Sequence, residues 1–482
     1  MKRCFLFWFL MCFLFIGYSS EAKPLYAPNQ VIVKFRPSTL SLQSFNLLLT
    51  QMGASEIYTS ELLPELKVIT FKNKSIDAVL TTLQSHPAVE YAEPNFILYL
   101  KDDGDDDDDD DDDNGKFPFP WPFPFPPPGD GEFPFPWPPG DGEFPWPWPP
   151  GDGGGDTPKD DPAPQLPPDP VTPSEDPDLN TSWGIGKTGA VNAWTTTVGS
   201  KDIIVGIVDT GIDYNHEDLI TNVYRNPKEI PDNAIDDDNN GFIDDVIGWD
   251  FVHNDHLPYD DHMHGTHVAG TIGATGNNGI GVSGINQVVT LLSAKAFDAS
   301  GSGAVETAIK AIEYVTAQGA KVINNSWGDS EFSQALEDIL AAVTKKGVTV
   351  VCAAGNETNN NDKKAMYPAN SASVISVAAT TKADKLAFFS NYGKKTVHLA
   401  APGAEIYSTV PGNKYDHLDG TSMASPHVAG AAALLLSLKP TLTPQEIKTV
   451  LMETVDKIST LSEKVVAGGR LNVEKAIEKL KK

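Results

Sequence analysis

Cysteine is scarce in this sequence, with three cysteines among 482 residues. Cys4 and Cys12 lie in an N-terminal apolar run, so removal of that run on export would leave Cys352 alone. One thiol cannot form an internal disulfide, which excludes a disulfide-stapled fold. The neighbours of Cys352 are apolar and offer no base, so we interpret it as a small buried residue rather than a nucleophile. Stability must then come from a large core, with bound metal as a second source.

Long apolar runs are also lacking. The run at residues 4–16 follows Lys2 and Arg3 and is too short to cross about 30 Å of hydrocarbon. It leads to Ser20-Glu21-Ala22, which resembles a signal peptidase site. We therefore expect a signal peptide at residues 1–22, a secreted protein (periplasmic where the source has an outer membrane) and no stable membrane insertion after its removal. The alternative is a retained anchor helix.

Basic residues are few, because 36 Lys and Arg stand against 65 Asp and Glu for a formal net charge of −29. Phosphate binding needs clustered positive charge, so nucleic-acid binding is excluded as the main function. The acidic excess is concentrated in residues 101–178, which contain 23 acidic and 3 basic residues and 23 of the 38 prolines. Such a composition buries little apolar area, and it predicts a disordered spacer between two folded parts.

The predicted spacer contains two kinds of sequence. Residues 105–113 are an unbroken acidic run, whose mutual repulsion excludes a helix or strand. Alternating Phe-Pro and Trp-Pro steps follow, and they favour a semi-stiff polyproline II conformation. We interpret the whole as a plain spacer. The alternatives are that its aromatic residues bind a cell-surface polymer or a partner groove, and that its acidic run collects calcium loosely.

The first folded part, residues 23–100, alternates strand and helix patterns. Apolar spacing predicts strands at residues 31–35, 66–71 and 89–91, and helices at residues 42–52 and 76–83. This order favours a small α+β, ferredoxin-like unit with two helices on one face of an antiparallel sheet.

The second folded part, residues 179–482, alternates buried strands with helices. Strands are predicted at residues 203–208, 291–294, 321–324, 348–353 and 374–378, and helices at 304–318 and 333–346. The pattern indicates an α/β fold, a parallel sheet covered by helices on both faces. Ligands bind such sheets beyond the carboxyl ends of the strands, so functional residues are expected in the loops there.

Two segments of the second part carry groups suited to general-base catalysis. Val208-Asp209-Thr210-Gly211 places Asp209 at the end of a buried strand, where its carboxylate can hold an imidazole by Nδ1–H. His264-Gly265-Thr266 opens an apolar helix, whose first residue is a rigid and accessible place for a base. Taken alone, Asp209 also suits a strand-end turn or a helix cap.

Metal binding is the alternative for the histidines. His262, His264 and His267 cluster beside Asp260 and Asp261. Their spacing lacks the helical His-Glu-x-x-His pattern of zinc peptidases, and we expect His267 to be a packed, hydrogen-bonded residue instead.

A third segment is Asp419-Gly420-Thr421-Ser422, which precedes a long apolar run. A serine at the N-terminus of a buried helix gains from the helix dipole and lies beside amides that can donate to a developing oxyanion. Taken alone, Thr421 or Ser422 also suits a helix cap.

Together these segments resemble the subtilisin-like serine peptidases (subtilases, peptidase family S8), which have the chain order Asp, His, Ser. The resemblance covers nearly all of residues 183–475. It implies that Ser422 is the nucleophile, His264 the general base and Asp209 the residue that orients His264. The stretch at residues 86–95 resembles the end of that family's propeptide, which implies that residues 23–100 chaperone folding and block the active site.

The resemblance extends to the substrate site. Gly355-Asn356 matches the segment whose asparagine donates to the oxyanion, so Asn356 and the Ser422 amide are expected to flank it. Tyr367-Pro368 resembles a segment with a cis proline. An apolar or aromatic side chain is expected before the scissile bond. Two extended edges are expected to hold the substrate as an added strand, and they consist of Gly301, Ser302, Gly303, Ser326, Trp327 and Gly328.

Calcium is the expected structural metal. The resemblance implies one site at Asp218 and the loop residues Gly276, Asn278, Ile280 and Val282. A second candidate follows the start of an EF-hand loop, with oxygen ligands at Asp236, Asp238 and Asn240, but Ile247 stands where the bidentate Glu belongs. The alternative for the second loop is a solvated acidic surface.

These observations predict a secreted, monomeric serine endopeptidase acting on proteins or peptides, made as a self-processing zymogen that its own propeptide inhibits. The alternatives are a dedicated maturation protease for one partner and a vestigial peptidase domain that serves as a surface-binding scaffold. Two maturation sites are consistent with the sequence. Cleavage near residues 98–101 would leave the spacer on the mature enzyme, and cleavage near residues 170–178 would discard it.

Overall fold

The computed structural model describes residues 25–37, 42–100, 161–168 and 175–481. The predicted signal peptide and most of the predicted spacer lie outside the described residues. The chain forms two large sheets, one mainly from residues before the predicted spacer and one from residues after it; β8 of the second part joins the edge of the first sheet.

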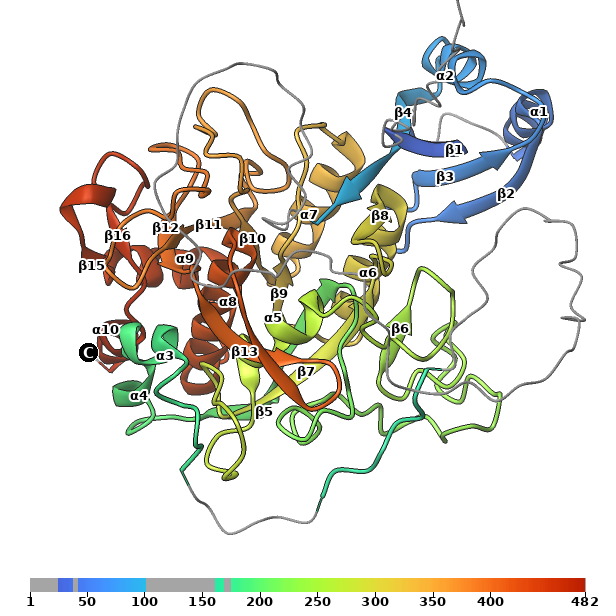
Figure 1. The fold of residues 1–482 in the computed structure, drawn as a ribbon. Coiled ribbons are helices and arrows are strands. Elements are labelled where there is room, and N and C mark those ends of the chain that lie inside the picture. The colour runs from blue at the N-terminus through green and yellow to red at the C-terminus, as the bar shows by residue number, and fades with distance from the viewer. Residues whose placement is uncertain (1–24, 38–41, 101–160, 169–174, 482) are drawn as a thin grey trace, which may run out of the picture. The chain divides into compact units, whose positions relative to one another are not determined.

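The N-terminal part is a small α+β unit (Figure 1). Its sheet is antiparallel in the order β2-β3-β1-β4, and its inward side chains, such as Val31, Val33 and Ile69, are fully buried against the two helices. The elements are β1 (Tyr26–Phe35), α1 (Leu42–Met52), β2 (Ala54–Thr59), β3 (Leu66–Phe71), α2 (Ile76–Gln84) and β4 (Val89–Tyr99).

The predicted helices and strands of this unit are confirmed, with three differences, the first of which is that β1 begins at Tyr26 and not at residue 31. Strand β2 was missed, because it is an edge strand with few apolar residues and its Ile57 is exposed. Strand β4 was predicted too short, since it continues past residue 91 to Tyr99. That extension matters, because it pairs with a strand of the second part.

The C-terminal part is built on a nine-stranded sheet in the order β15-β16-β12-β11-β10-β9-β5-β7-β6. Its ladders are parallel except for β15–β16. The strands are β5 (Gly199–Asp209), β6 (Gly248–Asp250), β7 (Val288–Lys295), β9 (Val322–Asn325), β10 (Thr349–Ala353), β11 (Val374–Thr380), β12 (Leu399–Pro402), β15 (Asp456–Lys457) and β16 (Gly469–Arg470).

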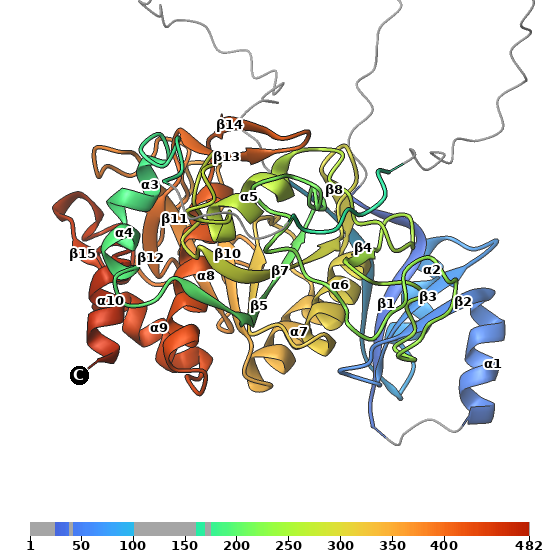
Figure 2. The same cartoon turned by 90° about the horizontal axis from the view of Figure 1, so that it is seen from below.

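Helices cover both faces of this sheet (Figures 1 and 2). One core contains α5 and α8, and the other contains α6 and α7. The helices are α3 (Trp183–Lys187), α4 (Ala190–Ala193), α5 (His264–Gly273), α6 (Val305–Ala317), α7 (Gln334–Lys345), α8 (Thr421–Leu438), α9 (Pro444–Glu453), α10 (Val473–Leu480) and the 3-10 turn η1 (Ser459–Leu461). The predicted fold class, a parallel sheet covered on both faces after a small α+β unit, is confirmed.

Three short strands lie outside the main sheet. Strand β8 (Ser302–Ala304) pairs with β4, and β13 (Ile406–Val410) pairs with β14 (Lys414–Leu418) as a hairpin beside α5 (Figure 2). Helix α8 is long and apolar enough to cross a membrane, but 89% of its apolar window is buried inside the protein, as expected for a core helix. Cys352 is buried and the Tyr367-Pro368 bond is cis, as predicted.

Candidate active site

A carboxylate and an imidazole meet at the carboxyl edge of the main sheet. Asp209 is the last residue of β5, and its Oδ1 accepts a hydrogen bond of 2.6 Å from Nδ1 of His264, the first residue of α5. Both side chains are fully buried. Gly265 allows this approach, because a Cβ there would lie 2.1 Å from the carbonyl oxygen of Gly211. The fold thus holds the ring by one nitrogen in a fixed orientation.

A buried carboxylate ties the strand end to the helix. Asp260 accepts hydrogen bonds from Oγ1 of Thr210 at 2.8 Å and from N and Oγ1 of Thr266 at 2.7 and 2.6 Å. Thr210 follows Asp209, and Thr266 lies two residues after His264 in α5. Asp260 is itself fully buried. Its role was missed in the sequence, where Asp260 appeared only as a possible neighbour of a metal site.

A buried cation completes the surroundings of Asp209. In the ladder, Lys295 of β7 is in register with Asp209 of β5 on one side and with Asp250 of β6 on the other. Its Nζ donates to the carbonyl oxygen of Thr210 at 2.6 Å and pairs with Asp261 at 2.7 Å. Because Lys295 is buried, its positive charge is weakly screened and offsets the negative charge of the carboxylates around it.

Ser422 lies at the end of β9, the strand that pairs with β5. Ser422 is the second residue of α8, and its Oγ donates to the carbonyl oxygen of Ser326 at 2.9 Å. Ser326 directly follows β9, which pairs with β5 through Val208 and Asn325. Asp209, His264 and Ser422 therefore gather at the carboxyl ends of two adjacent parallel strands, where the sequence predicted a functional site.

Two N–H donors converge beside Gly420. An ideal Cβ on Gly420 would lie 3.3 Å from Nδ2 of Asn356 and 3.4 Å from the backbone N of Ser422. Its φ of 150° further favours glycine. The amide of Asn356 is oriented by Thr421, which donates its N and Oγ1 to Oδ1 of Asn356 at 2.9 and 2.8 Å. The arrangement offers two donors to one small space next to Ser422.

The remaining predicted histidine behaves as a structural residue. Nε2 of His267 is 2.7 Å from the carbonyl oxygen of Ile406, and burial lowers the pKa of His267 to about 3. Within the described part of the chain, acidic side chains converge in metal-binding geometry at Glu229, Asp238 and Asp245, and not around the histidines. The geometry therefore does not support the metal-binding alternative for the histidine cluster.

The predicted substrate edge holds an extended segment of the chain's own N-terminal part. Strand β4 pairs antiparallel with β8, with Leu98 opposite Gly303 and Tyr99 opposite Ser302. The N of Leu100 then donates to the carbonyl oxygen of Gly301 at 2.8 Å. The side chain of Leu98 is 3% exposed and belongs to the core cluster around α6.

The second predicted edge, residues 326–328, is occupied by no strand among the described residues, and its Trp327 is buried. Nε1 of Trp327 donates to the carbonyl oxygen of Val208 at 2.9 Å, and its ring packs against Phe297. Trp327 is therefore packed inside the domain, beneath the predicted edge. A small pocket lies beside Ser422 and is lined by Ser326, Gly328 and Met366 among others. Met366 was missed, because it lies in a loop without a periodic pattern.

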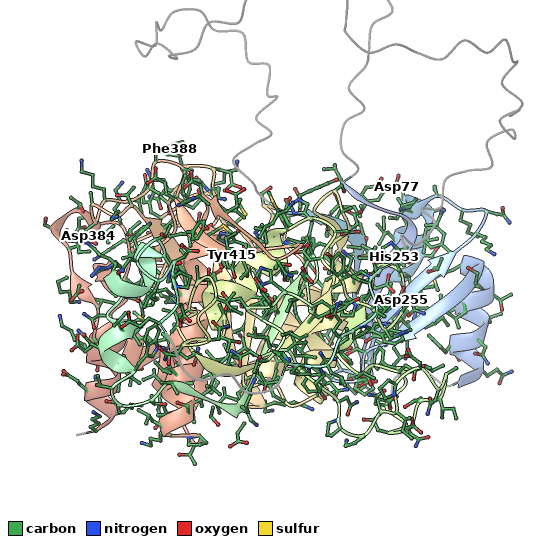
Figure 3. All side chains as sticks on the ribbon, turned by 60° about the horizontal axis from the view of Figure 1, so that its bottom comes forward. Asp77, His253, Asp255, Asp384, Phe388 and Tyr415 are labelled. Carbon is green, nitrogen blue, oxygen red and sulfur yellow. The ribbon has the colours of Figure 1, made fainter. Side chains whose placement is uncertain are left out.

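At the first predicted calcium site, Asp218 contacts the predicted loop. Its carboxylate accepts hydrogen bonds from Nδ2 of Asn278 and N of Val282, both at 2.9 Å. It also accepts the hydroxyl of Tyr415, which is labelled in Figure 3, at 3.2 Å. Asp176 was missed, and its carboxylate accepts the backbone N–H groups of residues 277–279. Burial raises the pKa of Asp218 to about 7 and also raises that of Asp176. Two buried carboxylates that contact the same loop suit Ca²⁺.

The second predicted site is only partly as expected. Asp238 meets Glu229 and Asp245, whose ligand atoms lie within 4.8 Å of one another. Asp236 instead accepts the backbone N–H groups of residues 240 and 241, and Asn240 donates to Asp245 at 3.0 Å. Burial raises the pKa of Asp245 to about 6. The EF-hand pattern thus identified the loop, but Glu229 lies outside the pattern.

Comparison with known proteins agrees with this geometry. A family model described as Subtilase family matches residues 200–472, and one described as Fervidolysin N-terminal prodomain matches residues 17–95. Thermophilic serine proteinase of Bacillus sp. (strain AK1) is 31% identical over 91% of this chain and 85% of that protein. Thermitase of Thermoactinomyces vulgaris is 38% identical over 61% of this chain and 95% of that protein.

Longer relatives match in part. Subtilisin-like protease 1 of Plasmodium falciparum (isolate 3D7) is 37% identical over 56% of this chain and 42% of that protein. The chain thus spans about half the length of the Plasmodium proteins of this name that it matches.

The contacts of Asp260 predict a stability effect. Asp260→Ala should lower the free energy of unfolding by about 3 kcal/mol, because Thr210 and Thr266 would lose a buried, charged acceptor. Urea denaturation measures the change. Asp202→Ala, at an exposed carboxylate, is the control and should change stability by less than about 0.5 kcal/mol. Equal effects of the two substitutions would contradict the linking role of Asp260.

Proposed function

Because the chain belongs to the subtilase family, we propose that it is a serine endopeptidase that hydrolyses peptide bonds through an acyl-enzyme. The observation that carries the proposal is the buried hydrogen bond between Asp209 and His264, at the sheet edge where Ser422 lies beside two convergent N–H donors. A general base, a nucleophile and an oxyanion site are thus within one small region.

In the proposed mechanism, Nε2 of His264 takes the proton of the Ser422 hydroxyl as Oγ attacks the substrate carbonyl. Ser422 exchanges its bond to Ser326 for one to His264 in this step. Asp209 holds Nδ1–H and stabilises the imidazolium, while Nδ2 of Asn356 and N of Ser422 donate to the oxyanion. His264 then protonates the leaving amine, and water releases the acyl group by the reverse sequence.

We also propose that the N-terminal unit inhibits the enzyme until it is removed. Strand β4 occupies the edge β8, where a substrate strand would pair. Two carboxylates, one of them in β4 itself, link the two parts. Glu93 accepts Oγ of Ser333 at 2.6 Å and N of Gln334 at 3.0 Å, and the buried Glu313 accepts the hydroxyl of Ser60. The anchoring of α7 by Glu93 also matches the positive end of the helix dipole.

Secretion and self-processing complete the proposal. The short apolar run at residues 4–16 supports export, and the position of β4 at the active edge supports cleavage of the chain by its own serine. Proteins and peptides are the proposed substrates, because pairing with β8 uses backbone groups that every peptide carries.

Calcium is proposed as the structural metal at two places. The first donor set is Asp176, Asp218 and Asn278, and the second is Glu229, Asp238 and Asp245. The ion would neutralise carboxylates that burial otherwise leaves close to one another, and so stabilise the loops that carry them.

Ser422→Ala should abolish hydrolysis of casein and separation of the N-terminal unit, because the variant lacks the attacking oxygen. A fall of about 10⁶-fold is the size known for removing the triad serine in subtilisin. Gel electrophoresis and a fluorogenic peptide measure the two activities. Labelling by a fluorophosphonate should be lost in parallel, and wild-type activity in this variant would refute the assignment.

Asn356→Ala should lower kcat by about 10²–10³-fold with little change in KM, because the lost donor acts on the oxyanion and not on the bound substrate. Steady-state kinetics on a peptide substrate separates the two constants. The control is Asn192→Ala at the exposed surface, which should leave both unchanged. A rise in KM alone would contradict the oxyanion role.

Removal of calcium with a chelator should lower the melting temperature by several degrees, because a ligand that binds only the folded state stabilises it, by about 2.7 kcal/mol at 100 times Kd. Calorimetry of the Ser422→Ala protein avoids autolysis. Asp245→Asn and Asp176→Asn should each reduce the response to calcium, and addition of Mg²⁺ should not replace it. An unchanged melting temperature with and without chelator would argue against both sites.

A further inference from the structure

Residues 161–168, a described segment of the predicted spacer, contact the peptidase domain through hydrogen bonds of their backbone. We call this segment the arm. Tyr214, whose hydroxyl donates a hydrogen bond to the arm, is fully buried. The four hydrogen bonds are Tyr214 hydroxyl to Pro162 O at 2.7 Å, Asn215 Nδ2 to Ala163 O at 2.9 Å, Gln165 N to Asn215 Oδ1 at 2.7 Å and Arg225 Nη2 to Gln165 O at 2.6 Å.

Asp176 and Asp178, a few residues after the arm, also make hydrogen bonds to the peptidase domain. Asp176 is 6% exposed, and its carboxylate accepts three backbone N–H groups of residues 277–279. The N of Asp178 donates to the carbonyl oxygen of Gly281 at 2.8 Å. Residues 162–168 and 175–481 belong to one compact unit together with the described residues up to Leu100. The spacer predicted at residues 101–178 therefore includes residues that contact the peptidase domain.

The residues just before the predicted spacer lie at the substrate edge. Leu98 is buried among core residues of the peptidase domain, and the N of Leu100 donates to Gly301 at 2.8 Å. Leu100, the last described residue before the predicted spacer, thus lies at the substrate edge. The arm contacts a different set of residues, around Tyr214 and Arg225, and its backbone groups are already used there.

We propose that maturation cuts the chain between Leu100 and Pro162, and that the mature peptidase keeps the arm together with the spacer residues that follow the cut. The inference rests on the proposed peptidase activity. Ser422 attacks the carbonyl carbon of the scissile bond, the C–N bond breaks, and the new amino group takes the proton from His264. Water then hydrolyses the ester and restores Ser422, so no other reactant is required.

Keeping the spacer residues that follow the cut makes the net charge of the mature peptidase more negative. The 23 acidic and 3 basic residues of positions 101–178 remain on the enzyme to the extent that the cut lies close to Leu100. A cut at residues 170–178 would remove them, and it would also separate the arm from the domain that it contacts. The mature enzyme is thus an acidic protein with an acidic, proline-rich N-terminal extension.

The test is N-terminal sequencing and intact mass measurement of the full chain after it has processed itself. Every N-terminus should fall between residues 101 and 162, including those produced by later trimming. An N-terminus at residue 163 or beyond would overturn the inference. Absence of any cut in the wild-type chain, or a cut that persists in Ser422→Ala, would instead refute the proposed function, so the two failures are distinguishable.

A second measurement tests the hold on the arm. Asn215→Ala/Arg225→Ala removes three of the four hydrogen bonds without touching the active site. In limited proteolysis of the Ser422→Ala protein with an unrelated protease, cleavage within residues 162–174 should become at least 10-fold faster. Asn192→Ala/Lys321→Ala, at exposed positions, is the matched control and should match the wild type. Equal rates in the two double variants would overturn the inference.

Discussion

The active site depends on one buried hydrogen bond, between a carboxylate at the end of a strand and an imidazole at the start of a helix. Asp209 and His264 can meet only because Gly265 lets α5 approach β5, and because Asp260 fixes the two segments to each other. Burial strengthens every one of these contacts and makes an unpaired member costly. The interior position of β5, between β9 and β7, therefore serves the chemistry as well as the core.

The two folded parts meet through the same kind of interaction that would bind a substrate. Strand β4 adds to β8 by backbone pairing, and Glu93 and Glu313 reinforce it at helices α7 and α6. The N-terminal unit thus combines a general mode of binding, which any extended peptide can use, with specific anchors that a passing substrate lacks. The proposed inhibition and the proposed self-cleavage would both follow from this one geometry.

Much of this could be predicted from the sequence, for identifiable reasons. Helices α1, α6 and α7 have strong apolar periodicity, and Asp209, His264 and Ser422 stand in local motifs whose neighbours reveal the strand end or helix start. Asp176, Glu229 and Met366 could not be found in the same way. Each acts through partners far away in the sequence, which only the fold brings together. The arm was missed because its composition is that of a linker, while its hydrogen bonds use backbone atoms that composition does not reveal.

The strand β8 is only three residues long, and release of β4 would leave its N–H and C=O groups without strand partners. Open edges of this kind invite sheet-to-sheet aggregation, and proteins commonly avoid it by keeping edge strands short. Residues 302–304 are long enough to align one extended peptide and too short to template a growing stack. Because β8 is short, it can pair with one extended substrate after another without promoting aggregation of the enzyme through its open strand edge.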